Sequence, residues 1–219
     1  MRRLWKTRRR KLALACFVAV FLYMVAEAAP VHRGRAAEWL PALPERSTPT
    51  QTVGVLGDAV HALSGRRVNV YCWSSADWER ARRTWRGRGP LTPWRAYTSP
   101  ADRSVNLGPN VCTELERLRG RNRPIADYRD RRAAAWAVEA VAHESVHVSG
   151  IRNEAKAECY GIQRTQTAAV WLGLTPADGR YLAALYLRDW YPRGPMAYRS
   201  DECRDGRRLD LHPDSRRWP

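Results

Sequence analysis

Residues 131–148 are predicted to form a long helix that sets the positions of two histidines. The segment is rich in alanine, the strongest helix former, and Asp130 precedes it as a candidate N-cap. Gly150 is expected to end the helix. His143 and His147 are four positions apart, so their imidazoles lie one turn apart on the same face. Two imidazoles in this arrangement can reach one metal ion.

A second helix is predicted for residues 154–172, with Asn153 as its N-cap and Gly173 after its last turn. It carries Glu154 and Glu158, which are also four positions apart and therefore share one face. If the chain reverses between the two predicted helices, they run antiparallel. The two carboxylates of the second helix then face the two histidines of the first.

These facing pairs predict a zinc site. In the antiparallel arrangement Glu154 lies level with His147. Glu158 likewise lies level with His143. A catalytic zinc ion usually takes three protein ligands and a water, and we expect His143, His147 and Glu154 to be those ligands. Glu158 then orients a histidine through its outer ring nitrogen. The spacing also allows the reverse assignment, in which Glu158 is the ligand and Glu154 orients the histidine. Glu144, which adjoins His143, can reach the metal-bound water and act as its general base.

The pattern resembles that of the gluzincin metallopeptidases. In that group, a glutamate on a later helix completes the zinc site begun by His-Glu-x-x-His, and an acidic residue four positions on holds the first histidine. The matching residues here are His143-Glu-x-x-His147 followed by Asn153-Glu154-x-x-x-Glu158. Only six residues separate His147 from Glu154, which is more similar to compact gluzincins than to the large ones. Metzincins are less similar, because their pattern requires a histidine at Asn153.

The resemblance covers residues 140–165 and implies zinc-dependent hydrolysis of peptide bonds in a peptide or protein substrate. It also implies a zincin-like α+β fold in which an edge strand pairs with the substrate, and residues 104–107 are the candidate for that strand. A further group usually stabilises the oxyanion. The spacing does not select it from four candidates, which are Tyr160, Tyr198, Arg199 and His212.

A small sheet with further helices is predicted around this site. Apolar and polar residues alternate over residues 68–72, which is typical of a strand, and residues 91–103 are interpreted as a loop or a short hairpin. The further predicted helices are residues 53–63 before Gly65, residues 75–85 with Ser75 as the cap, residues 109–118, and a helix opened by Thr175-Pro176 with Asp178 in a capping box.

Residues 1–29 have the order of a secretory signal. Seven cations precede residues 12–26, which carry no charge, and Ala26 and Ala28 supply an A-x-A cleavage pattern. Whether the segment is cleaved or remains as a membrane anchor stays open at this point, and in both cases the rest of the chain is expected outside the cytoplasm. The predicted organisation after it is a Pro-rich linker over residues 30–52, a metallopeptidase domain over residues 53–191 and a C-terminal tail over residues 192–219.

Four cysteines follow the predicted signal, an even number that allows three pairings. We favour Cys72–Cys112 and Cys159–Cys203, because each bridge then stays within one half of the domain. The second bridge would tether the C-terminal tail through Cys203. A four-cysteine zinc site is excluded by the lack of any Cys-x-x-Cys pair.

The charge of the chain narrows the classes of partner. The formal net charge is +16, and residues 29–219 keep 31 basic against 21 acidic side chains. The basic residues are almost all arginine and are scattered, so that together with export they argue against a nucleic-acid partner. An anionic lipid or envelope surface suits this charge better. The main alternative function is a non-catalytic, zinc-stabilised binding or scaffold module of the cell envelope.

Overall fold

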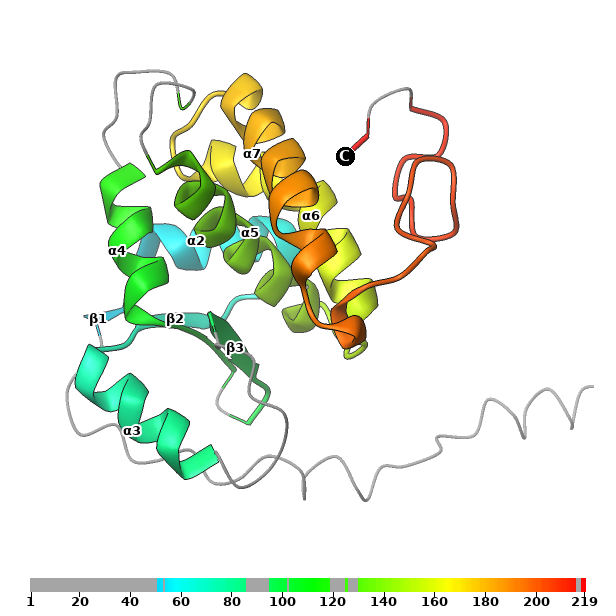
Figure 1. Cartoon of the computed structure of the whole chain (residues 1–219). Coiled ribbons are helices and arrows are strands. Elements are labelled where there is room, and N and C mark those ends of the chain that lie inside the picture. Colours follow the sequence, from blue (N-terminus) through cyan, green and yellow to red (C-terminus); the bar gives the residue numbers. More distant parts are fainter. Residues whose placement is uncertain are drawn as a thin grey trace, which may run out of the picture. The chain divides into compact units, whose positions relative to one another are not determined.

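Helices make up most of the part of the chain that the structure describes. This structure is a computed structural model that describes residues 51–52, 54–85, 95–101, 103–118, 125, 130–215 and 218–219. The predicted signal segment 1–29 and residues 30–50 of the predicted linker lie outside them. The helices are α2 (Gly54–Ser64), α3 (Ser75–Trp85), α4 (Pro109–Leu118), α5 (Arg131–Val148), α6 (Glu154–Trp171) and α7 (Pro176–Asp189) (Figure 1). With the sheet described next, they confirm the predicted α+β class.

A four-stranded sheet has the order β1-β2-β4-β3. Its strands are β1 (Gln51–Thr52), β2 (Asn69–Cys72), β3 (Ala96–Ser99) and β4 (Ser104–Leu107). Strands β2 and β4 pair in parallel, whereas β1 with β2 and β3 with β4 pair antiparallel. The sequence predicts that Gln51 and Thr52 belong to the linker, but their backbone pairs with β2.

The prediction of residues 104–107 as the edge strand is wrong. This segment, β4, lies between β2 and β3, and all four of its residues are buried. The edges of the described sheet are β1 and β3, and β3 forms a hairpin with β4. The polar side chains of Ser104 and Asn106 made β4 resemble a half-exposed strand. They are buried because Asn106 accepts a hydrogen bond from the indole of Trp73 and donates one to Ser104.

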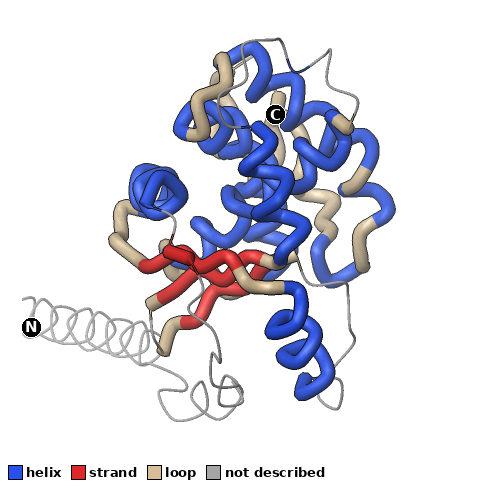
Figure 2. The backbone as a smooth tube through the Cα atoms, turned by 90° about the vertical axis from the view of Figure 1, so that its left-hand side faces the viewer, coloured by secondary structure: helices blue, strands red, loops and turns tan. Residues whose placement is uncertain are grey.

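Helices cover both faces of this sheet (Figures 1 and 2). Helix α3 lies on one face, where Trp73, Trp78 and Tyr97 pack together. Helices α2 and α5 lie against the other face. Helix α5 also contacts α4, α6 and α7, so it forms the centre of the main core. Its small alanines allow neighbouring helices to approach closely, and 13 of the 18 residues of α5 are buried.

The helix ends follow the predicted capping chemistry with two exceptions. Asn153 accepts a hydrogen bond from the backbone of Lys156, and Thr175 forms a capping box with Asp178. Asp130 precedes α5 as predicted, but its side chain makes no capping bond. Helix α3 is capped by Ser74 rather than by Ser75, because the hydroxyl of Ser74 accepts the bond from Asp77 N.

Both predicted disulfides are present. Cys72 on β2 is joined to Cys112 on α4, and Cys159 on α6 is joined to Cys203 in the C-terminal tail. Two such bridges are compatible with a location outside the cytoplasm. None of the described helices combines the length and the apolar character that crossing a membrane requires.

Removal of the second bridge is expected to destabilise the protein by about 2–4 kcal/mol, because the bridge limits the freedom of the unfolded chain. The variant is Cys159→Ala with Cys203→Ala, and chemical denaturation measures the free energy of unfolding. Arg204→Ala is the control, because its exposed side chain lies in the same segment and should change stability little. Equal stability of the double variant and the wild type would contradict the prediction.

Candidate metal centre

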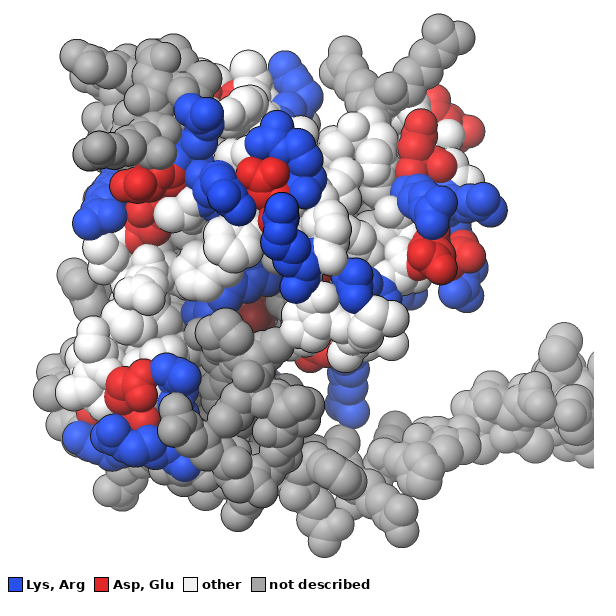
Figure 3. Space-filling model, viewed as in Figure 1, with Lys and Arg blue, Asp and Glu red and all other residues white. Residues whose placement is uncertain are grey.

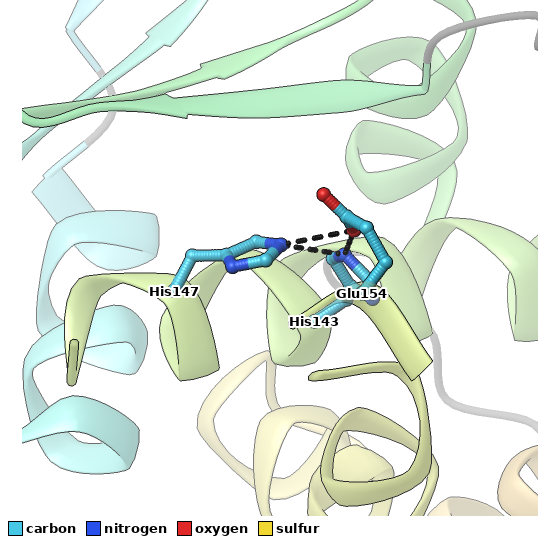
Figure 4. A group of neighbouring side chains, drawn as sticks. All are labelled: His143, His147 and Glu154. Carbon is cyan, nitrogen blue, oxygen red and sulfur yellow. Dashed lines mark hydrogen bonds and ion pairs between the residues drawn. The ribbon is translucent and has the colours of Figure 1, made fainter. Parts of the chain in front are cut away.

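Three side chains from α5 and α6 converge on one point (Figure 4). The Nε2 atoms of His143 and His147 lie 3.0 Å apart. Oε2 of Glu154 lies 3.3 Å from Nε2 of His143 and 3.2 Å from Nε2 of His147. Three ligands at tetrahedral angles around a zinc ion would be separated by about 3.3 Å. The observed triangle is therefore close to the spacing that zinc requires.

The contacts of the outer nitrogen, Nδ1, of each imidazole determine which form the inner nitrogen, Nε2, presents to the centre of this triangle. Nδ1 of His147 lies 2.7 Å from the carbonyl oxygen of Ile151, which can only accept a hydrogen bond. Nδ1 of His143 lies 2.8 Å from a carboxylate oxygen of Glu158. When the two rings are neutral, this arrangement places the proton on each Nδ1 and leaves a lone pair on each Nε2. With the rings in this form, the two Nε2 atoms and the Glu154 oxygen offer three ligand atoms toward one point, so the residues fit a zinc ion.

The two histidines and Glu154 shift one another's pKa values so that each favours its charged form. Burial alone would lower the pKa of His143, but contacts with Glu154 and Glu158 outweigh it and raise this pKa well above its usual value. The pKa of His147 is raised in the same way, because its contact with Glu154 outweighs burial. Burial would raise the pKa of Glu154, yet the two histidines lower it to about 2. Glu154 is thus a carboxylate, and protons compete with any metal for the histidines.

A second cluster of acidic side chains lies behind His143. Glu139 on α5 is fully buried and forms an ion pair with Arg95 at 2.5 Å. Glu158 accepts a hydrogen bond of 2.5 Å from the hydroxyl of Tyr186 and lies 3.4 Å from Arg95. Burial raises the pKa of Glu139 to about 7, with Arg95 opposing the shift. Because Arg95 balances these carboxylates, this cluster supports the outer side of His143 rather than offering a second metal site.

Glu144, the predicted general base, lies under the edge strand of the sheet. Its carboxylate is buried and accepts a hydrogen bond of 2.7 Å from the hydroxyl of Thr98 on β3. The same hydroxyl lies 3.2 Å from the Glu144 carbonyl oxygen. Glu144 is therefore held by a strand that joins α5 only in the tertiary structure.

Tyr198 is the one oxyanion candidate that the structure brings to the predicted ligands. It lies in the short 3-10 helix η3 (Met196–Tyr198), and its ring stacks on His143 with centroids 5.8 Å apart. Burial, followed by the charges of Glu154 and Glu144, raises the pKa of Tyr198 well above its usual value. Its hydroxyl therefore stays protonated and can donate. Of the other candidates, Tyr160 and Arg199 line a different cavity.

The sequence interpretation missed the supporting residues Arg95, Thr98, Glu139 and Tyr186. Only Glu139 had a local signal, because it precedes His143 by four positions and so lies on the same helix face. Arg95 and Thr98 reach the site from the sheet, and Tyr186 reaches it from α7. No spacing in the sequence relates Arg95, Thr98 or Tyr186 to the histidines.

Gly161 allows α6 to approach α5 beside the candidate metal ligands. A Cβ atom at this position would lie 2.8 Å from Oε1 of Glu139 and 3.0 Å from both Cα and N of His143. The contact with the Glu139 oxygen is closer than real Cβ atoms come to any neighbour, and the contacts with the His143 backbone are tighter than nine in ten real ones. An added side chain would therefore require Glu139 to move and would press the two helices apart. The glycine thus sets the separation between the histidines on α5 and the carboxylates on α6.

Gly161→Ala is expected to lower both stability and zinc affinity. Alanine gains about 1 kcal/mol of helix propensity over glycine, but overpacking at a rigid backbone contact costs about 1–3 kcal/mol. Gly57→Ala in α2 is the matched control, since its nearest neighbour would be 3.7 Å away and only the propensity gain remains. Denaturation and metal titration measure the two effects. A Gly161→Ala protein as stable as the Gly57→Ala protein would show that the helices have room to separate.

Comparison of the chain with protein-family models, curated proteins and solved structures found no match.

Proposed function

We propose that this protein is a zinc-dependent peptidase of the gluzincin type that acts outside the cytoplasm. The observation that carries the proposal is the convergence of three possible ligand atoms, from His143, His147 and Glu154, on one point. The outer imidazole nitrogens lie 2.7 Å from the Ile151 carbonyl oxygen and 2.8 Å from a Glu158 carboxylate oxygen. Such an arrangement suits a metal ion with one position left for water. The neighbouring carboxylate of Glu144 supplies the group that a hydrolytic site needs and a structural site does not.

A zinc ion held by these three residues would polarise the substrate carbonyl and lower the pKa of water. Glu144 takes the proton from the attacking water and then delivers it to the leaving amine. Thr98 keeps the Glu144 carboxylate in place during both transfers through its hydrogen bond. Glu158 fixes the ring of His143, and Arg95 and Tyr186 fix Glu158 in turn.

The substrate is proposed to pair with β3. This strand is at the edge of the described sheet, and an extended peptide can extend a sheet by backbone hydrogen bonds at such an edge. Thr98 joins β3 directly to Glu144, so a peptide on β3 would lie beside the general base. Tyr198 comes from the C-terminal tail and stacks on His143. Its hydroxyl is proposed to donate a hydrogen bond to the oxyanion that forms when water attacks the substrate carbonyl.

The test is a combined measurement of metal content and peptide hydrolysis on the full chain. Purified protein is expected to hold one zinc ion, to cleave members of a broad peptide library, to lose activity with a chelator and to regain it with added zinc. Bound zinc without any turnover would favour the non-catalytic envelope module instead. Absence of zinc binding would contradict both functions.

The surface charge gives no reason to prefer a nucleic-acid ligand. On the face shown in Figure 3, Lys and Arg are interspersed with Asp and Glu over several elements. A nucleic-acid-binding surface would gather its cations in one patch or stripe.

A further inference from the structure

A cavity of about 380 Å³ lies between the start of α6 and the C-terminal tail. We call it the tail cavity. None of the predicted metal ligands lines it, so it is distinct from the metal centre. Its volume is in the range of small-molecule binding sites. Its polar lining residues are Asn153, Lys156, Tyr160, Arg199, Ser200 and Arg208.

The lining of the tail cavity is cationic and rich in hydrogen-bond donors. Three of its residues are Lys or Arg, and no Asp or Glu is among the described residues that line it. The amide oxygen of Asn153 accepts the capping bond from Lys156 N, which leaves the amide NH₂ group to donate. The cavity also includes the first turn of α6, where the positive end of the helix dipole favours anions.

Two of the cations have no anionic partner among the described residues. Arg199 donates to the carbonyl oxygen of Pro192 and to the sulfur of Met196, both of which are neutral. Its Nε is buried without a hydrogen-bond partner. Lys156 is held over the ring of Tyr160 at 5.4 Å. Arg208 lies 3.9 Å from Glu202 and is mostly exposed, so it belongs to the rim.

The two walls of the cavity are fastened to each other. The Cys159–Cys203 disulfide links α6 to the tail. The side chain of Gln163 on α6 donates to Leu209 O at 2.8 Å and accepts from Leu211 N at 2.7 Å. The backbone segments that carry Lys156 and Arg199 are therefore linked to each other, and such preorganisation favours the binding of a small anionic group.

We propose that the tail cavity binds an oxyanion group, a phosphate or a carboxylate, between Lys156 on α6 and Arg199 in the tail. Buried or half-buried cations without a counter-charge are satisfied by such a group, and Arg in particular binds phosphate and carboxylate through its planar fork. The group belongs either to a small free anion or to an acidic segment of a polypeptide.

The experiment is calorimetric titration of the full chain at constant ionic strength with two probes. Inorganic phosphate represents the free anion. The peptide Glu-Glu-Glu represents an acidic segment, with Gln-Gln-Gln as its neutral control. At least one anionic probe is expected to bind saturably, and the tighter of the two identifies the source of the group.

Lys156→Gln and Arg199→Gln are each expected to weaken this binding by about ten- to a hundredfold, the worth of a charge-assisted hydrogen bond. Arg204→Gln is the matched control, because it removes the same charge from the same tail but does not line the cavity. It should change the affinity less than twofold. Lys156→Gln guards against misfolding, since Arg199 also holds Pro192 and Lys156 makes no such bond.

Three outcomes would overturn the proposal. Neither probe binds saturably, the control variant loses as much affinity as the two cavity variants, or binding survives both cavity variants. The last would place the anion outside the tail cavity. Zinc content measured on the same samples keeps this result separate from the proposed peptidase function, because the cavity variants leave every predicted metal ligand in place.

Discussion

Glu144→Gln is expected to reduce peptide hydrolysis by about 10²–10⁴ while leaving zinc content and fold nearly unchanged. The amide has the size and shape of the carboxylate and can still pair with the hydroxyl of Thr98, so the buried contact with β3 is kept. What it loses is the ability to take a proton from water. Steady-state hydrolysis of a cleaved library peptide, with metal analysis of the same samples, measures the effect.

Glu79→Gln is the matched control for this variant. Glu79 lies on α3, on the other face of the sheet, where it pairs with Arg82. The same chemical change there should leave hydrolysis within error of the wild type. Undiminished hydrolysis by the Glu144→Gln protein would mean that Glu144 is not the base. In that case the zinc site could still be correct, but the proposed role of Glu144 in hydrolysis would be wrong.

Glu154→Ala is expected to remove most of the bound zinc, and Glu158→Gln to weaken zinc binding by about ten- to a hundredfold. The difference follows from the positions of the two carboxylates. Glu154 points at the inner nitrogen of both histidines, at 3.2 and 3.3 Å, and would bind the metal directly. Glu158 lies 2.8 Å from the outer nitrogen of His143 and acts only through that ring. Competition with a chelator of known affinity measures both variants.

If the Glu158 variant lost more zinc binding than the Glu154 variant, the roles of the two carboxylates would have to be exchanged. His143→Ala serves as the reference for a lost ligand, since His143 is a predicted ligand under either assignment. Circular dichroism of each variant separates loss of metal from loss of fold. This control matters most for Glu158→Gln, because Glu158 also accepts the Tyr186 hydroxyl and pairs with Arg95 in the core.

Local sequence patterns were sufficient to predict the two helices at the centre of this protein. Helix periodicity places residues four apart on one face, and a cap acts within a single turn. For this reason the spacing of His143 and His147, and the N-cap at Asn153, could be recognised without any tertiary information. The antiparallel reversal between α5 and α6 then sufficed to pair each histidine with a carboxylate. Both disulfides were predicted from the assumption that each bridge stays within one half of the domain.

Strand order and the support of the site depended on the tertiary structure. Strand order is decided by backbone pairing between segments far apart in the sequence, since β4 pairs with both β2 and β3. Short polar strands carry no signal for this order. Arg95 and Thr98 meet residues of α5 that are 44 and 46 positions away. Tyr198 reaches His143 because η3 packs against α6, and the Cys159–Cys203 disulfide joins the same tail to α6. Contacts of this kind depend on the packing of the whole core, so no pattern within a few residues can specify them.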